Sequence, residues 1–229
     1  MQPKEKLQSI LNNEYKSEDG DSYKVVPFKG LSDSEISAFE KAMPNSYLPV
    51  EIKALLKFAR GFDFSDLEEV EFDTYGYFGF DALFPNSIQL AGDGYGNFWI
   101  LDIDSKGNWK EVYFVCHDPA VVVKQSENLS EFIGHVDEFG LRGAKSHLEI
   151  IHSKTVMDIW KNKVGIMESN ETQYNFPPEI VAQLPASYLV ADLTNKPLKT
   201  GFAWGKFGVN AKIIRVGDKP IWIIDNSNS

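Results

Sequence analysis

The sequence predicts an α+β fold, and three observations support that class. In the first 61 residues, apolar side chains recur at the three- and four-residue intervals of amphipathic helices. From Ile88 the pattern changes to short apolar runs separated by turns rich in Gly, Asp and Asn, as in β-hairpins. Similar runs return from Tyr188 to the end of the chain. We therefore expect helices first, then a β region, and a C-terminal α+β portion that contains a second β-hairpin.

Three helices are predicted before residue 61. The first covers residues 4–15, and a strand at residues 23–28 follows it. Ser32 stands three residues before Glu35, a spacing at which each side chain can satisfy the other residue's exposed backbone amide. This capping box predicts the start of the second helix, and Pro44 stops it.

The third predicted helix opens at Pro49, because proline suits the first turn of a helix. Gly61 is placed to end this helix as the C′ residue, the position just beyond a helix where glycine is favoured. We expect one apolar stripe of the helix to face the core. It consists of Leu48, Ile52, Leu55, Leu56 and Ala59.

The clearest prediction in the middle of the chain is a β-hairpin. Its strands are residues 98–103 and 109–116, and the polar loop 104–108 joins them. A turn-rich segment at residues 92–97 precedes the hairpin. The valine-rich run at residues 120–124 predicts a strand that is buried on both sides or that lies in the interior of a sheet.

Caps and prolines locate the remaining elements. Ser126 can cap a helix with an apolar inner face, and a further helix is predicted over residues 147–161. A short helix opens near Pro178. The expected C-terminal strands cover residues 188–193, 201–206, 211–216 and 220–224, and the last two form the second hairpin.

Composition excludes several classes of protein. No apolar stretch approaches the roughly 18 residues of a membrane-spanning helix, and the first residues lack the apolar core of a secretory signal, so we expect a cytoplasmic protein. A single cysteine, Cys116, excludes an internal disulfide and any multi-cysteine metal site. The net charge of −10 argues against binding to nucleic acids or anionic membranes.

The negative charge is concentrated in one part of the chain. Residues 1–139 hold 12 Lys and Arg against 25 Asp and Glu, whereas residues 140–229 hold 11 against 8. No Lys or Arg occurs from Gly61 to Ser105, where acidic and aromatic residues alternate. One interpretation is a hairpin or edge region with aromatic rings in the core and carboxylates in water. The other is an acidic, aromatic surface that docks on a basic partner.

The second interpretation defines a set of candidate partner-binding residues. They come from the acidic segment and from the turn at residues 92–97. The set is Asp63, Asp66, Glu68, Glu69, Glu71, Asp73, Tyr75, Tyr77, Asp93 and Tyr95.

The sequence does not predict a metal site. His147 and His152 are five residues apart, which places them about 140° apart around a helix, whereas a spacing of four would put both on one face. Asp102 and Asp104 begin a calcium-loop pattern, but that loop needs an oxygen ligand where this chain has Lys106. A hairpin turn explains the same residues.

No catalytic or cofactor-binding group is predicted either. The glycines at positions 92, 94 and 96 lack the spacing and the following helix of a dinucleotide-binding loop. Cys116 and His117 are neighbours at a strand end, so their side chains should point to opposite faces, and Cys116 is expected in the core. An enzyme with a site in the C-terminal part stays open as an alternative to a binding protein.

Several segments between Leu31 and Phe139 share their order and spacing with a known family. They are Leu48-Pro49-x-x-Ile52 leading to Leu55-Leu56 and Gly61, then Gly94-Tyr95-Gly96-Asn97-Phe98-Trp99-x-Leu101-Asp102, Val112-Tyr113, His117-Asp118 and residues 126–132. Together they resemble the SUKH superfamily, which joins the yeast cell-wall glucan-synthesis regulator to many bacterial immunity proteins. The family usually has an acid at the position of Asn97.

The resemblance implies a domain of helices packed on a mostly antiparallel sheet, without catalytic residues. It places a SUKH-like domain at residues 1–139, with its core at about 31–139, and leaves residues 140–229 as a C-terminal α+β extension or small second domain. Bacterial members look like neutralisers of nuclease or deaminase toxins, which tend to be basic.

Two functions follow from the resemblance. The first is an immunity protein that neutralises a basic toxin domain through its acidic surface. The alternative is a regulatory or scaffold protein of the glucan-synthesis regulator type, which acts through protein–protein interaction. In both cases we expect a monomer or weak homodimer that is not an enzyme and needs no cofactor.

Overall fold

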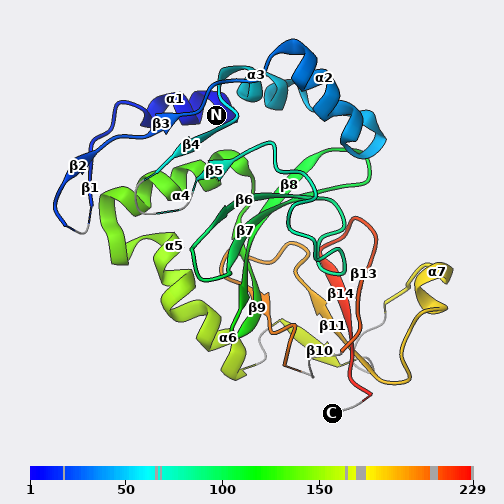
Figure 1. The fold of residues 1–229 in the computed structure, drawn as a ribbon. Coiled ribbons are helices and arrows are strands. Elements are labelled where there is room, and N and C mark those ends of the chain that lie inside the picture. The colour runs from blue at the N-terminus through cyan, green and yellow to red at the C-terminus, as the bar shows by residue number, and fades with distance from the viewer. Residues whose placement is uncertain are drawn as a thin grey trace.

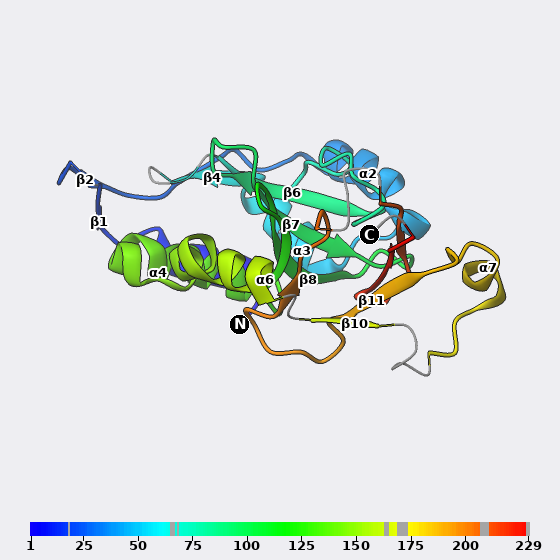
Figure 2. The ribbon, with the colours of Figure 1, turned by 90° about the horizontal axis from the view of Figure 1, so that it is seen from below.

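The protein has an α+β fold, as predicted, with a five-stranded antiparallel sheet at its centre (Figure 1). Helices cover one face of this sheet, and a smaller C-terminal sheet covers part of the other. Figure 2 shows that α4 and α7, the helices on the two sides, lie at opposite ends of the molecule. The computed structural model describes residues 1–17, 19–64, 67, 69–162, 165–168, 174–206 and 211–227.

The helices lie close to where their local sequence signals place them. The capping box of the second helix is confirmed, since Ser32 Oγ accepts a hydrogen bond from Glu35 N at 3.3 Å and Glu35 Oε2 accepts one from Ser32 N at 2.7 Å. The helices are α1 (Pro3–Ile10), α2 (Asp33–Ala42), α3 (Val50–Phe58), α4 (Leu129–Arg142), α5 (His147–Ile150), α6 (Val156–Asn162) and α7 (Pro178–Val181). Short 3₁₀ turns occupy Pro44–Ser46 and Gly143–Lys145, and a π-helical turn occupies Ile151–Thr155.

The strands form four sheets within the described residues. The central sheet has the order β12-β9-β8-β7-β6, the C-terminal sheet β10-β11-β14-β13, and the two small ones β3-β4-β5 and β1-β2. Their bounds are β1 (Tyr15–Lys16), β2 (Ser22–Tyr23), β3 (Val26–Pro27), β4 (Gly61–Asp63), β5 (Val70–Glu71), β6 (Ser87–Gly92), β7 (Phe98–Ile103), β8 (Trp109–His117), β9 (Ala120–Ser126), β10 (Ile166–Glu168), β11 (Tyr188–Asp192), β12 (Gly201–Phe202), β13 (Ile213–Arg215) and β14 (Ile221–Asp225).

Alternation along β8 and β9 separates two cores. Phe114 and Val123 face the helices and pack in the cluster that contains residues of α1, α3 and α4. Tyr113 and Val122 face the other way and pack with residues of β11 and β14, including Trp222. Because successive side chains of a strand point to opposite faces, the valine run of β9 is buried on both sides, as predicted.

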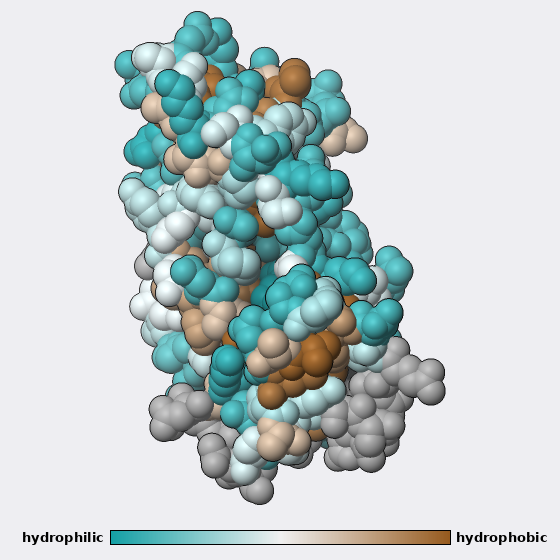
Figure 3. Space-filling view, turned by 90° about the vertical axis from the view of Figure 1, so that its right-hand side faces the viewer, coloured by the Kyte–Doolittle hydropathy of each residue, from teal (hydrophilic) through white to brown (hydrophobic). Residues whose placement is uncertain are grey.

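The C-terminal portion contributes a strand to the central sheet. Gly201 and Phe202 of β12 pair with Val123 and Val122 of β9. A third apolar cluster lies on the outer side of the C-terminal sheet, around Ile180 of α7. Figure 3, which views the molecule from the α7 side, shows a hydrophobic patch at the level of this sheet.

Two predicted boundaries are wrong because tertiary contacts decide them. The first helix ends at Ile10, and Tyr15 belongs to β1. Gly61 does not end α3 as its C′ residue. It begins β4, where a side chain is excluded because a Cβ atom would lie 2.2 Å from the carbonyl oxygen of Val70.

Two further corrections concern the helices that follow the central sheet. Ser126 ends β9, and Asn128 caps α4 instead, with its Oδ1 accepting a hydrogen bond from Glu131 N at 3.0 Å. The helix predicted over residues 147–161 is interrupted by the π-helical turn Ile151–Thr155.

Candidate functional site

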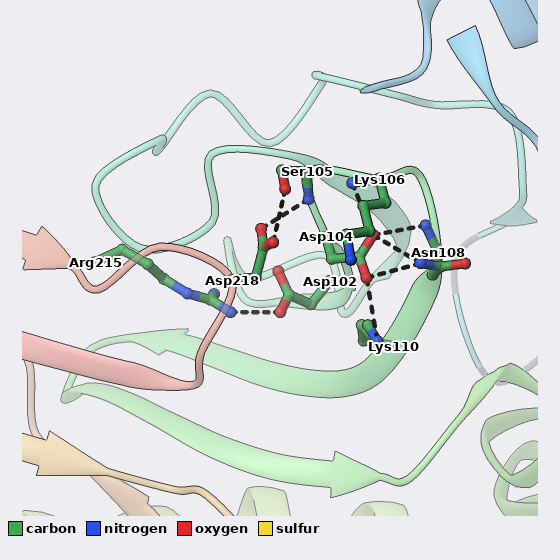
Figure 4. A network of polar contacts seen from close by, with 8 residues as sticks. All are labelled: Asp102, Asp104, Ser105, Lys106, Asn108, Lys110, Arg215 and Asp218. Carbon is green, nitrogen blue, oxygen red and sulfur yellow. Dashed lines mark hydrogen bonds and ion pairs between the residues drawn. The ribbon is translucent and has the colours of Figure 1, made fainter. Parts of the chain in front are cut away.

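The acidic segment divides into a buried part and a surface part. Asp102, on β7, lies in the seam between the central and C-terminal sheets, where its Oδ2 accepts a hydrogen bond from Arg215 Nη2 at 2.5 Å (Figure 4). The guanidinium of Arg215 also donates to Leu83 O and lies 4.7 Å from the centre of the Trp222 ring. Burial raises the pKa of Asp102 to about 6, although Arg215 opposes that rise.

Asp104 shapes the loop that joins β7 to β8. Its carboxylate accepts hydrogen bonds from the backbone amides of Lys106 at 3.0 Å and Asn108 at 2.8 Å, and Lys110 Nζ lies 3.2 Å away (Figure 4). Burial would raise the pKa of Asp104, but hydrogen bonds from Asn108 and Lys110 lower it below its ordinary value. These two acids therefore serve the fold.

The adjacent loop ties the two parts of the chain together. The carboxylate of Asp218 accepts hydrogen bonds from Ser105 N at 2.7 Å and from Ser105 Oγ at 2.6 Å (Figure 4). With the Arg215–Asp102 pair, this contact joins the mildly basic C-terminal portion to the acidic N-terminal portion.

The surface part of the acidic segment surrounds a hollow of about 500 Å³, which we call the acidic hollow. It lies between the end of β4, β5 and the edge strand β6. Three carboxylates line it, and no Lys or Arg is among its described lining residues. The lining consists of Asp63, Leu67, Glu69, Glu71, Gln89, Ala91 and Gly92.

The carboxylates of the acidic hollow are not equivalent. Glu71 Oε1 accepts a hydrogen bond from Arg60 Nη1 at 3.1 Å, and the same nitrogen lies 3.8 Å from Asp73 Oδ2. Burial raises the pKa of Glu71, while Arg60 opposes the shift. Asp63 and Glu69 are exposed. Asp63 and Glu69 are therefore the more accessible carboxylates of the acidic hollow.

A second, larger depression of about 1030 Å³ shares Leu67 with the acidic hollow, and we call it the groove. The β1–β2 hairpin, the turn after β6, the end of α4 and the start of the following helix form its walls. Its lining is Lys16, Ser17, Asp19, Leu67, Asp93, Gly94, Tyr95, Trp99, Phe139, Gly140, Leu141, Gly143, Ala144, Leu148, Glu149 and His152.

Asp93 organises the turn at the edge of the groove. Its Oδ1 accepts hydrogen bonds from Tyr95 N at 2.9 Å and Asn97 N at 3.1 Å. Asn97 Oδ1 in turn accepts a hydrogen bond from His117 N at 3.0 Å, so an amide suits this position in the turn. On the other side, Asp93 Oδ2 lies 3.5 Å from His152 Nε2 of the π-helical turn. Asp93 thus connects the two walls of the groove.

Close packing at Gly140 holds the hairpin wall against α4. A Cβ atom on Gly140 would lie 2.4 Å from Tyr15 Cδ1 and 2.8 Å from Phe64 Cζ. The Tyr15 hydroxyl donates a hydrogen bond to Asp137 Oδ1 of α4 at 2.9 Å. The hairpin therefore approaches α4 at the distance that a glycine permits.

The structure distributes the ten predicted partner-binding residues over several places. Asp63, Glu69 and Glu71 line the acidic hollow, and Asp93 and Tyr95 line the groove. Asp73 lies beside Arg60, Tyr75 donates to Asn86 Oδ1 at 2.8 Å, and Tyr77 is exposed, but these three line neither depression. Asp66 and Glu68 lie outside the described residues.

Sequence reasoning missed the walls of the groove that come from Lys16, Ser17 and Asp19 and from residues 139–152. These segments are far apart in the chain and carry no local motif. Leu141, at the end of α4, is 61% exposed in the structure, but no sequence pattern distinguishes it from an apolar residue of the core.

The described residues contain no cluster of three or more His, Cys, Asp or Glu side chains able to hold a metal ion. Over the same part of the chain, no helix has both the length and the apolar character needed to cross a membrane. Cys116 is buried in the helix-side core, as predicted.

Comparison with known proteins gives one match. Residues 30–135 match the model of the SMI1 / KNR4 family (SUKH-1). No curated protein and no solved structure matches the chain. The family match confirms the resemblance to the SUKH superfamily over this segment, which supplies the acidic hollow and one wall of the groove.

Proposed function

We propose that this protein is a non-catalytic immunity protein that neutralises a basic toxin domain by binding it at the acidic hollow. The observation that carries the proposal is the convergence of Asp63, Glu69 and Glu71 on one depression. The family match over residues 30–135 supports a protein-binding role. Toxins that cleave or modify nucleic acids need basic surfaces to bind phosphates, so an acidic protein can occupy the same surface.

Charge complementarity would accelerate the encounter of the two proteins and also stabilise the complex once it has formed. The acidic excess of residues 1–139 gives a negative field that attracts a basic domain and accelerates its association. The buried acids Asp102 and Asp104 are already engaged with Arg215 and Lys110. Among the described carboxylates of the acidic hollow, the exposed side chains of Asp63 and Glu69 are the candidates for steering.

Co-expression tests the proposal directly. A small basic toxin domain encoded next to this chain should arrest growth when expressed alone, and this protein should restore growth. The two purified proteins should form a complex that blocks the toxin's activity. Failure of the rescue and of binding would overturn the toxin-neutralising function, and the regulator-type alternative would then take its place.

A charge-reversal variant tests the mechanism. We expect Asp63→Lys combined with Glu69→Lys to slow association with the toxin domain about tenfold at low salt and to weaken its salt dependence. The matched control reverses Glu51 and Glu179, two exposed acids on α3 and α7 that do not line the acidic hollow. Equal association rates for both variants would contradict docking at the acidic hollow.

A further inference from the structure

The groove has an apolar floor between two exposed apolar residues. Trp99 and Leu148 are 4% and 3% exposed and line its base. The Trp99 ring is held by Phe114, with 5.1 Å between the ring centres. Tyr95, on the turn, and Leu141, at the end of α4, are 79% and 61% exposed. Such aromatic and aliphatic side chains around one depression resemble the hot spots that anchor protein partners.

The charged residues at the edge of the groove favour a cationic partner. Asp19 and Glu149 contribute carboxylates, whereas the Asp93 carboxylate is already engaged by its own turn and by His152. Lys16 is turned into its own hairpin, where its Nζ donates to Ser22 Oγ at 2.9 Å and to Gly20 O at 3.5 Å. Lys16, the Lys or Arg among the described lining residues of the groove, is therefore engaged within the hairpin. The acidic hollow adjoins the groove at Leu67 and adds further negative charge nearby.

We propose that the groove binds a segment of the protein partner that presents one large apolar side chain flanked by Lys or Arg. This inference rests on the proposed function, because it assigns a part of the same partner to a second place on the same surface. The apolar side chain would bury itself against Trp99 and Leu148, and the flanking cations would face Asp19 and Glu149.

The origin of the walls bears on partner choice. Asp93, Tyr95 and Trp99 lie within the segment that matches the family model, whereas residues 16–19 and 139–152 lie outside it. The family-matched segment therefore supplies one side of the groove, and the flanking segments supply the other. We assign partner discrimination to those flanking walls, because they set the shape that the apolar side chain meets.

Peptide titration of the whole chain, followed by ¹⁵N–¹H NMR, tests the groove without the toxin. The probe is a short peptide with a single Trp between Lys residues. We expect the NMR signals of residues 93–95 and 140–149 and of the Trp99 indole to change their chemical shifts when the peptide binds. Peptides in which Trp is replaced by Ser, or Lys by Glu, should bind at least about tenfold more weakly. Shifts spread over other surfaces, or equal binding of all three peptides, would overturn the proposal.

Matched variants separate the apolar contact from general effects. Leu141→Ser should weaken binding of the Trp peptide about tenfold, whereas Val181→Ser, at a 53% exposed apolar residue on α7, should leave it unchanged. Unchanged binding by the Leu141 variant would overturn the role of the groove. Backbone shifts in the free proteins verify that both variants are folded.

Failure of this inference differs from failure of the proposed function. With the toxin domain, Leu141→Ser should mainly speed dissociation, whereas the reversal of Asp63 and Glu69 should mainly slow association. A toxin that binds but ignores Leu141→Ser would overturn the groove alone. Peptide binding in the groove without toxin rescue would overturn the toxin-neutralising function and leave the groove as a protein-binding site.

Discussion

The acids near the acidic hollow and those near the β7–β8 loop come from one segment without Lys or Arg, yet they lie in opposite environments. Asp63 and Glu69 are exposed, whereas Asp102 and Asp104 are buried and engaged. Asp102 is engaged by Arg215, a cation more than a hundred positions away, whereas Asp104 is engaged by Lys110 and by the backbone amides of its own loop. A concentration of acidic residues therefore does not define one surface. Its members divide according to the strand or loop that packs against them.

The largest effect should come from breaking the buried pair. Arg215→Ala leaves the Asp102 carboxylate buried without its cation, so the free energy of unfolding should fall by about 3–5 kcal/mol. Chemical denaturation measures this loss. Arg142→Ala, which removes an exposed pair with Glu138, is the control and should cost less than about 1 kcal/mol. Similar losses for both variants would contradict a larger contribution of the buried pair to stability.

A pH titration sharpens the contrast between the two faces of the central sheet. On the helix side, burial and repulsion by the charge of the neighbouring His147 lower the pKa of His135 to about 4, against 6.5 for a free histidine. Between these two pKa values, the unfolded chain therefore binds a proton at His135 that the folded protein does not bind. Through His135, stability falls as the pH drops from about 6.5 toward 4.

On the opposite face of the sheet, protonation of Asp102 has the opposite effect on stability. Its pKa is raised from 3.8 to about 6, so the folded protein takes up the proton first and gains stability as the pH drops over that range. His135→Gln should remove the first contribution and make the free energy of unfolding decline less steeply between pH 6.5 and 4. Urea denaturation at a series of pH values measures the slope. A variant with the slope of the original protein would contradict the assignment.

A smaller effect should follow from Asp104→Ala. This change removes the acceptor for the amides of Lys106 and Asn108, so we expect a loss of about 1–2 kcal/mol and greater mobility in the β7–β8 loop. Denaturation measures the loss, and amide hydrogen exchange at residues 105–108 measures the mobility. Asp104→Asn, which keeps an acceptor oxygen, should recover part of the stability. Unchanged exchange in the alanine variant would exclude this role.

The smallest stability effect is expected where the binding effect is expected to be largest. Asp63→Lys with Glu69→Lys should change the free energy of unfolding by no more than about 0.5 kcal/mol, because both side chains are exposed. Thermal denaturation checks this value. A large loss would mean that these acids belong with the structural group of Asp102 and Asp104.

Local signals predicted the elements that depend on nearby residues. The capping box of Ser32 and Glu35 involves residues three apart, and the strand at 98–103 depends on a short apolar run between two turns, so both are confirmed. Local patterns place Gly61 and Ser126 at helix ends. Their true roles come from Val70 O and from pairing with Val112, contacts that short-range periodicity does not contain.

The site shows the same limit. Carboxylates and aromatic rings could be read from the acidic segment, but the sequence does not tell that Asp102 meets Arg215, more than a hundred positions away. The groove is harder still, since its walls come from residues on both sides of the family-matched segment. Only the packing of the hairpin, α4 and the turn at 93–95 brings them together.

The glycine at position 140 sets the distance between the β1–β2 hairpin and α4, and with it the width of the groove. Because Tyr15 and Phe64 occupy the space that a methyl group would need, replacing Gly140 by Ala would push the β1–β2 hairpin away from α4. The aperture of the groove would widen, and with it the size of the side chain that can enter. If the groove binds a partner segment as proposed, Gly140→Ala would change the size of the side chain that it admits and leave the net charge of the protein unchanged.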